Sequence, residues 1–99
     1  MTERSLRSEH HDDPLDAAWR VPEQVSIRPE RFGALLYHFG TRRLSFLKSP
    51  TLLTVVRSLA EFPTARDACV HAGVADADLP SYRTALATLA ASDMIRERS

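Results

Sequence analysis

The pattern of apolar and polar positions is most distinctive in residues 35–50, LLYHFGTRRLSFLKSP, where two apolar runs flank a short turn. The first run is apolar at almost every position, which is typical of a central strand covered on both faces, or nearly so. The second run is more mixed, which favours a strand at the edge of a sheet. Gly40 is predicted to make the turn, because glycine adopts positive φ angles at little cost. Residues 25–28 are predicted as a further strand that ends at Pro29, which has no N–H to donate.

Apolar residues recur at helical spacing directly after this hairpin. The first helix is predicted over residues 50–62, with Ser49 as its N-cap. The second is predicted over residues 65–72, with Thr64 at its start as a cap and Gly73 just past its C-terminus, and the third over residues 79–92. This order of elements predicts an α+β fold of the winged helix-turn-helix type, in which a three-stranded antiparallel sheet is followed by three helices.

The chain has 99 residues, which suits a single domain. Residues 1–18 are polar and lack apolar periodicity, so they are predicted to be a flexible N-terminal arm, with residues 19–99 forming the domain. The first fourteen residues contain only Met1 and Leu6 as large apolar side chains, so no secretory signal is expected. No apolar run is long enough to span a bilayer. A cytoplasmic location without a membrane partner is therefore predicted.

Candidate catalytic residues are sparse. Cys69 is the single cysteine and shares a helix face with alanines, which favours a buried apolar role. His10 and His11 are adjacent in the arm, where they would make a poor metal site. His38 is expected at a half-buried sheet position and His71 at an exposed position near a helix end. Because no motif for metal, phosphate or nucleophilic chemistry is present, the chain is predicted not to be an enzyme and to need no cofactor or metal.

The charge is unevenly distributed although the net charge is zero. Residues 1–24 hold three basic and six acidic residues, residues 28–48 hold five and one, and residues 64–99 hold four and five. A winged-helix DNA-binding transcriptional regulator is the alternative function, but DNA binding requires several phosphates to be neutralised at once. The third helix offers only Arg83 for such contacts. No nucleic-acid partner is therefore predicted, and the positive field lies on the hairpin.

An open edge on the second hairpin strand would let an extended peptide pair with it as an added strand, and the third helix would form the opposite wall of the groove. The basic hairpin would favour an acidic peptide, although Arg42 and Arg43 could equally serve to deter edge-to-edge association. An open edge also permits a homodimer by strand exchange. The candidate peptide-binding residues are Arg42, Arg43, Leu44, Ser45, Phe46, Leu47, Lys48, Tyr82, Arg83 and Leu86.

Two segments, SIRPERFGALLYHFGTRRLSFLKS and ALATLAASDMIRER, carry a resemblance to a known family. With the order of elements, they resemble the pyrroloquinoline quinone chaperone-like family of precursor-peptide recognition domains (RiPP recognition elements), and more closely the mycofactocin-system peptide chaperones. The resemblance covers about residues 19–98. His38 and Phe39 stand where members of the broader family often carry Pro-Glu before the turn glycine.

The resemblance implies that the chain binds the leader of a short, ribosomally made precursor peptide. It implies strand addition at residues 43–48, in a cleft against Tyr82, Arg83 and Leu86. It also implies that the peptide is presented to a radical S-adenosylmethionine (radical SAM) maturase in mycofactocin biosynthesis, and that the chaperone itself holds no iron–sulfur cluster.

Overall fold

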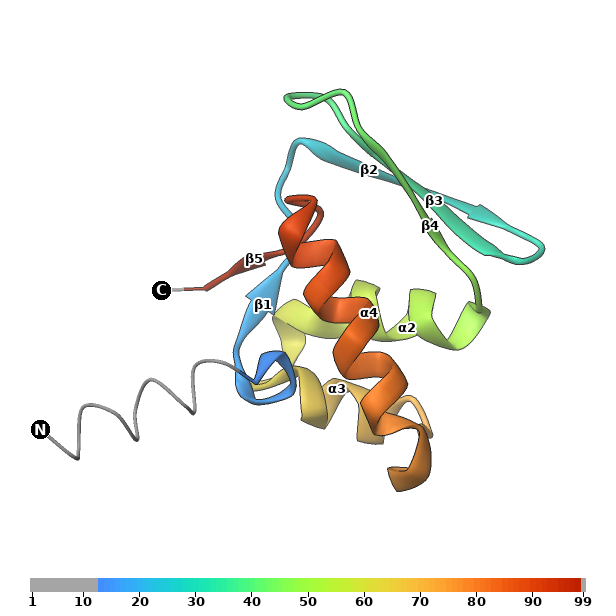
Figure 1. Ribbon diagram of the computed structural model, residues 1–99, viewed down its shortest axis with the longest axis vertical. Helices are drawn as coiled ribbons and strands as arrows, with labels where there is room; N and C mark the ends of the chain where they lie inside the picture. Colours follow the sequence, from blue (N-terminus) through green and yellow to red (C-terminus); the bar gives the residue numbers. More distant parts are fainter. Residues whose placement is uncertain (1–12, 99) are drawn as a thin grey trace, which may run out of the picture.

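A three-stranded antiparallel sheet forms one layer of the computed structural model, which describes residues 13–98 (Figure 1). Strands β2 (Val25–Glu30), β3 (Gly33–His38) and β4 (Leu44–Leu47) follow one another in the chain and are neighbours in the sheet in the same order. β3 is thus the central strand, and β4 is an edge strand, as predicted.

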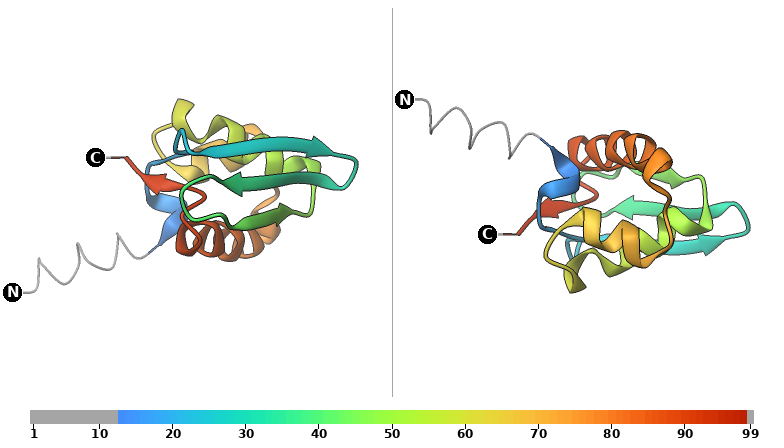
Figure 2. Two further views of the ribbon diagram at one scale, coloured as in Figure 1. Left: turned by 90° about the horizontal axis from the view of Figure 1, so that it is seen from above. Right: turned by 90° about the horizontal axis from the view of Figure 1, so that it is seen from below.

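Three helices cover one face of this sheet (Figure 2). They are α2 (Pro50–Ser58), α3 (Ala65–His71) and α4 (Leu79–Ala91); short 3-10 turns, η2 (Leu59–Glu61) and η3 (Asp76–Asp78), follow α2 and precede α4. The predicted α+β class, with a three-stranded antiparallel sheet followed by three helices, is confirmed. None of the described helices is both long enough and apolar enough to cross a membrane.

The helix ends follow the capping residues that the sequence indicates. The hydroxyl oxygen of Ser49 accepts a hydrogen bond from the backbone N–H of Leu52 (3.0 Å) at the start of α2. At the start of α3, the hydroxyl oxygen of Thr64 accepts one from the N–H of Asp67 (3.2 Å). Gly73 ends α3 with a φ of 88°. These caps satisfy backbone groups that a helix cannot pair internally.

The folded domain begins earlier than the predicted boundary at residue 19. Leu15 lies in the 3-10 turn η1 (Pro14–Asp16), and its side chain is completely buried. A buried leucine of this size stabilises the fold by roughly 1.5–3 kcal/mol, so the segment from Asp13 onward belongs to the domain. Residues 1–12, the rest of the predicted arm, lie outside the described residues.

A second pairing joins the two ends of the described chain. β1 (Trp19–Arg20) runs antiparallel to β5 (Arg96–Glu97). The indole N–H of Trp19 also donates to the carbonyl of Pro14 (2.8 Å), which fixes the entry into β1. This pairing was not predicted, because two-residue strands are too short to show an alternating pattern.

An ionic cluster fastens the N-terminal segment to α3 and α4. The guanidinium of Arg83 donates from Nε to Oδ1 of Asp13 (3.2 Å), and Arg66 donates from Nε to Oδ1 of Asp16 (2.9 Å). Burial acts to raise the pKa of Asp13. The hydrogen bond from the N–H of Leu15 has the opposite effect, as do the hydrogen bond and charge of Arg83 and the charge of Arg66. Together these interactions outweigh burial and lower the pKa of Asp13 below its ordinary value.

We expect this carboxylate to make the fold sensitive to acid. A group whose pKa is lower in the folded state stabilises the fold above its unfolded pKa, about 4 for aspartate, and loses that contribution as the pH falls through the folded value. Urea titrations between pH 6 and pH 2.5 should therefore show a smaller loss of stability on acidification for Asp13→Asn than for the wild type. Superimposable pH profiles for the two proteins would contradict this assignment.

The core lies between the sheet and the helices and extends under the N-terminal segment. Its largest completely buried side chains are Leu15, Leu36, Leu47, Val55, Val56, Leu59, Cys69, Leu86 and Met94. Burial raises the pKa of the Cys69 thiol, against the opposing charge of Arg66. The predicted role of Cys69 as a small buried apolar residue is confirmed.

Strand β2 continues through Pro29, where the sequence predicted an end. The N–H of Phe39 donates to the carbonyl of Gln24 (2.8 Å), so these two residues form a hydrogen-bonded pair. Because hydrogen-bonded and non-hydrogen-bonded pairs alternate along an antiparallel ladder, the nitrogen of Pro29, opposite Ala34, points to the open edge of β2. Pro29 therefore removes no hydrogen bond from the sheet.

The β3–β4 turn also differs from the predicted one. The positive φ, 64°, occurs at Arg42 and not at Gly40. His38 fills the turn: its Nδ1 accepts hydrogen bonds from the N–H groups of Gly40 (3.0 Å) and Thr41 (3.1 Å), and the residue is only 4% exposed. A Cβ at position 40 would lie 2.9 Å from Cε1 of His38, so a side chain at this position would displace the imidazole. His38, the last residue of β3, is therefore buried and not half-buried as predicted.

Candidate functional site

The two faces of the sheet differ in how they are covered. Ala34, Leu36 and His38 of β3 are buried towards the helices. Leu35 and Tyr37 point to the opposite face and are only half-buried. No described element covers that face (Figure 1). The expectation that β3 is covered on both faces, or nearly so, was therefore wrong. β3 is the central strand of the sheet, but helices cover only one of its faces.

Strand β4 leaves one row of backbone groups without partners in the sheet. The N–H of His38 donates to the carbonyl of Arg43 (3.0 Å), which makes these two residues a hydrogen-bonded pair. By the alternation of an antiparallel ladder, Ser45 also directs its backbone groups towards β3. The N–H and C=O groups of Leu44 and Phe46 consequently point away from β3, at the open edge of the sheet.

A cleft of about 540 Å³ lies between this edge and α4, which runs along the same side of the sheet (Figure 2). A smaller hollow of about 180 Å³ adjoins it near the start of α2. Residues from β4, α2 and α4 line the two spaces: Ser45, Phe46, Leu47, Lys48, Ser49, Leu52, Ser81, Tyr82, Ala85, Thr88 and Leu89. The cleft is thus apolar in its interior with several hydroxyl groups along it.

Half of the ten predicted site residues line the cleft or the hollow beside it. They are Ser45, Phe46, Leu47, Lys48 and Tyr82. Leu44 is at the open edge beside them. Arg42 and Arg43 are exposed at the turn that leads into β4.

Two predicted residues of α4 face other directions. Leu86 is completely buried in the core, and Arg83 is held by Asp13 outside the cleft. The cause is the helical rotation of about 100° per residue. Tyr82, Ala85 and Leu89 share a stripe at spacings of three and four residues, and Arg83 and Leu86 belong to the neighbouring stripe.

The small residues of α4 that form the cleft wall were not predicted from the sequence. Ser81, Ala85 and Thr88 recur at helical spacing and carry short side chains. Such a stripe leaves room for another chain segment to approach the helix closely. The sequence contains this face of small residues, but it does not indicate which neighbouring element the face would pack against.

The described part of the chain holds no other constellation for chemistry. Within residues 13–98, no group of three or more His, Cys, Asp or Glu residues is arranged to hold a metal ion. His71 is exposed as expected, and its ring packs against Phe62 with ring centroids 5.0 Å apart. Cys69 and His38 are buried in structural roles. The cleft is therefore the candidate site, and its residues are suited to binding.

An open sheet edge beside a helix-lined cleft is typical of domains that take up an extended segment as an added strand. Comparison with known proteins identifies the family of the chain. Residues 18–96 match the peptide chaperone MftB family. The chain belongs to that family, which confirms the resemblance noted in its sequence.

Three curated relatives support the assignment, and each is named peptide chaperone MftB. The relative from Mycobacterium tuberculosis is 57% identical over 96% of this chain and 87% of its own length. Those from Mycobacterium ulcerans and Mycolicibacterium smegmatis are 59% and 57% identical over 84% of this chain, and 75% and 80% of their own lengths. Their name denotes a chaperone and not a catalyst, so the expectation of a non-enzymatic protein is confirmed. No solved structure matches the chain, and the winged-helix label remains a prediction.

Proposed function

We propose that the protein captures the leader of a short, ribosomally made precursor peptide on the edge of β4 and presents it to a radical SAM maturase in mycofactocin biosynthesis, in the cytoplasm. The observation that carries the proposal is the row of outward backbone groups of Leu44 and Phe46 beside the cleft. Membership of the peptide chaperone MftB family supports it.

The cleft is suited to a peptide in an extended conformation. In an antiparallel ladder, a residue at a hydrogen-bonded position donates its N–H to its partner and accepts a hydrogen bond at its C=O from the same partner. Leu44 and Phe46 can each do so with an added strand. Alternate side chains of that strand would then point into the cleft, towards Leu52, Ala85 and Leu89.

The charges near the edge favour an acidic peptide. Arg42 and Arg43 are exposed at the start of β4, and Lys48 lines the cleft just after its end. Exposed charges of this kind increase the rate of encounter more than the affinity. The wall formed by α4 provides no basic side chain to the cleft, since Arg83 is engaged by Asp13. A nucleic-acid partner is accordingly not proposed.

Hydrogen exchange of single backbone amides tests the proposal directly. The N–H groups of Ser45 and Leu47, which point to β3, should already be protected in the free protein. The N–H groups of Leu44 and Phe46 should exchange fast in the free protein and slowly once a synthetic leader peptide is added. A peptide that binds without slowing exchange at positions 44 and 46 would show that it does not add to this edge.

A further inference from the structure

The uncovered face of the sheet gathers nearly all the exposed large apolar side chains of the described chain. Leu44 lies opposite Tyr37, and Phe46 lies opposite Leu35, so these four side chains point to the same face. We call this surface the outer patch, and it comprises Phe32 (45% exposed), Leu35, Tyr37, Phe39 (61%), Leu44 (59%) and Phe46 (59%). Among residues 13–98, the other exposed large apolar residue is Val70 on α3.

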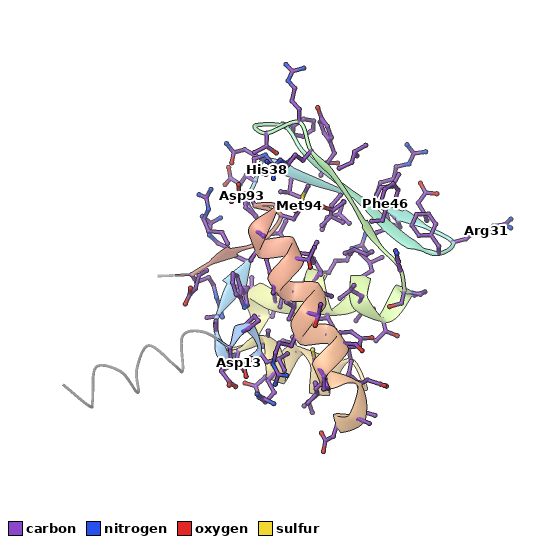
Figure 3. All side chains as sticks on the ribbon, in the orientation of Figure 1. Asp13, Arg31, His38, Phe46, Asp93 and Met94 are labelled. Atoms are coloured by element: carbon purple, nitrogen blue, oxygen red, sulfur yellow. The ribbon has the colours of Figure 1, made fainter. Side chains whose placement is uncertain are left out.

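The outer patch is an organised surface. Phe32 packs against Phe46 with ring centroids 6.3 Å apart, and Tyr37 meets Phe39 edge to face at 5.2 Å. Phe32 and Phe39, which lie in the turns at the two ends of the sheet, therefore each add a ring to the patch. Figure 3 shows Phe46 on the sheet and Arg31 at the tip of the β2–β3 turn. Contiguous exposed apolar surfaces on small proteins commonly mark sites of protein association.

The charges around the outer patch narrow the choice of partner. Arg31 lies in the β2–β3 turn at one end and Arg42 in the β3–β4 turn at the other, and both are exposed. Arg28 lies on the patch side of β2, opposite Leu35, with Glu30 2.9 Å away. A second copy of the chain packed face to face would oppose two positively charged surfaces, which is unfavourable. A partner with acidic residues around its own apolar surface would be complementary.

A single-stranded nucleic acid is less well matched to this surface. Such ligands stack their bases on exposed aromatic ring faces. Here the rings pack against one another in pairs, and Leu35 and Leu44 occupy the positions between them. The combination of aliphatic and aromatic side chains fits the apolar centre of a protein–protein interface better.

We infer that the outer patch is the docking surface for a second, folded protein whose contact surface is apolar with carboxylates at its rim. The inference rests on the proposed function, in which this partner is the maturase. At the β4 edge, the backbone of Leu44 and Phe46 faces the cleft while their side chains face the outer patch. A peptide strand added to β4 would place every second side chain beside them and extend the patch. The partner would thus contact chaperone and peptide on one continuous face.

The test uses a variant that leaves the β4 edge intact, Phe32→Ser combined with Phe39→Ser. Val70→Ser is the matched control, because it removes a similarly exposed apolar side chain away from the sheet. Binding of the purified maturase of the same system is measured by titration calorimetry, and binding of the leader peptide is measured separately. We expect at least tenfold weaker maturase binding for the double variant, with unchanged peptide binding and an unaffected control.

Charge reversal gives an independent readout of the same surface. Arg31→Glu should weaken maturase binding and reduce its dependence on salt concentration, whereas Arg57→Glu, on the exposed side of α2, should do neither. Unchanged maturase affinity in both outer-patch variants would overturn the inference. So would a wild-type dimer that dissociates in the double variant, or salt-dependent binding of single-stranded DNA that the double variant loses. Failure of the wild type to bind the peptide would instead count against the proposed function, because maturase binding is measured without peptide.

Discussion

Replacing Phe46 by proline should abolish peptide capture while leaving the domain folded. The backbone N–H of Phe46 points to the open edge, so its loss removes no hydrogen bond from the sheet. An added strand would lose one main-chain hydrogen bond, about 1 kcal/mol, and would also meet the proline ring. Affinity for the leader peptide should therefore fall by tenfold or more, as measured by fluorescence anisotropy or calorimetry.

Two matched variants separate the loss of the Phe46 N–H from the loss of its side chain and from a general effect of proline in β4. Phe46→Ala removes the aromatic side chain but keeps the N–H, so it should retain strand addition. Ser45→Pro removes an N–H that points to β3 and leaves the Leu36 carbonyl without its partner, so it should lower the free energy of unfolding by roughly 1–3 kcal/mol. If Phe46→Pro binds the peptide as tightly as Phe46→Ala does, the edge of β4 is not the binding element.

Replacing Gly33 by alanine should destabilise the domain by at least about 2 kcal/mol. A Cβ at this position would lie 2.0 Å from the carbonyl oxygen of Leu47 and 2.9 Å from the backbone nitrogen of Ser49. Both are main-chain atoms, so neither can move aside without shifting the end of β4 and the start of α2. Chemical denaturation should show the loss of stability, and peptide affinity should fall with it because the cleft begins there.

Gly73→Ala is the control for this prediction. Gly73 has a φ of 88°, and no heavy atom lies within 4 Å of the position that its Cβ would occupy. Only backbone strain applies there, about 1–2 kcal/mol, and peptide binding should be unaffected because Gly73 ends α3, away from the cleft. Equal destabilisation by the two substitutions would show that the contact between Gly33 and Leu47 is not tight.

The fold could be predicted from the sequence wherever local signals were strong. Ser49, Thr64 and Gly73 mark helix ends with side chains or backbone freedom that act within one turn, so their effects were readable. The end of α4 was harder. Asp93 takes the positive φ, 62°, that glycine usually takes at a helix C-terminus, so the sequence carried no such signal there.

The open edge of the sheet could be predicted, but the helix wall beside it could not be predicted residue by residue. The mixed pattern of residues 43–48 was enough to identify an edge strand. The wall depends on how α4 is rotated, which Leu86 in the core and the distant carboxylate of Asp13 determine together. An ion pair between residues so far apart in sequence leaves no local pattern, so the positions of Arg83 and Leu86 outside the cleft could not be predicted.

The pairing of β1 with β5 has a consequence for the order of folding. β2, β3 and β4 are neighbours in both chain and sheet, so they can pair after closing only short loops. β1 pairs with Arg96–Glu97, at the other end of the described chain. The loop that this pairing closes is long, so its entropic cost is larger. We therefore expect the edge of β4 to form before the N-terminal segment docks and Leu15 completes the core. In that interval the edge of β4 would be exposed on an incompletely folded chain, which favours aggregation. The exposed charges of Arg42 and Arg43 would then protect the nascent protein from edge-to-edge association.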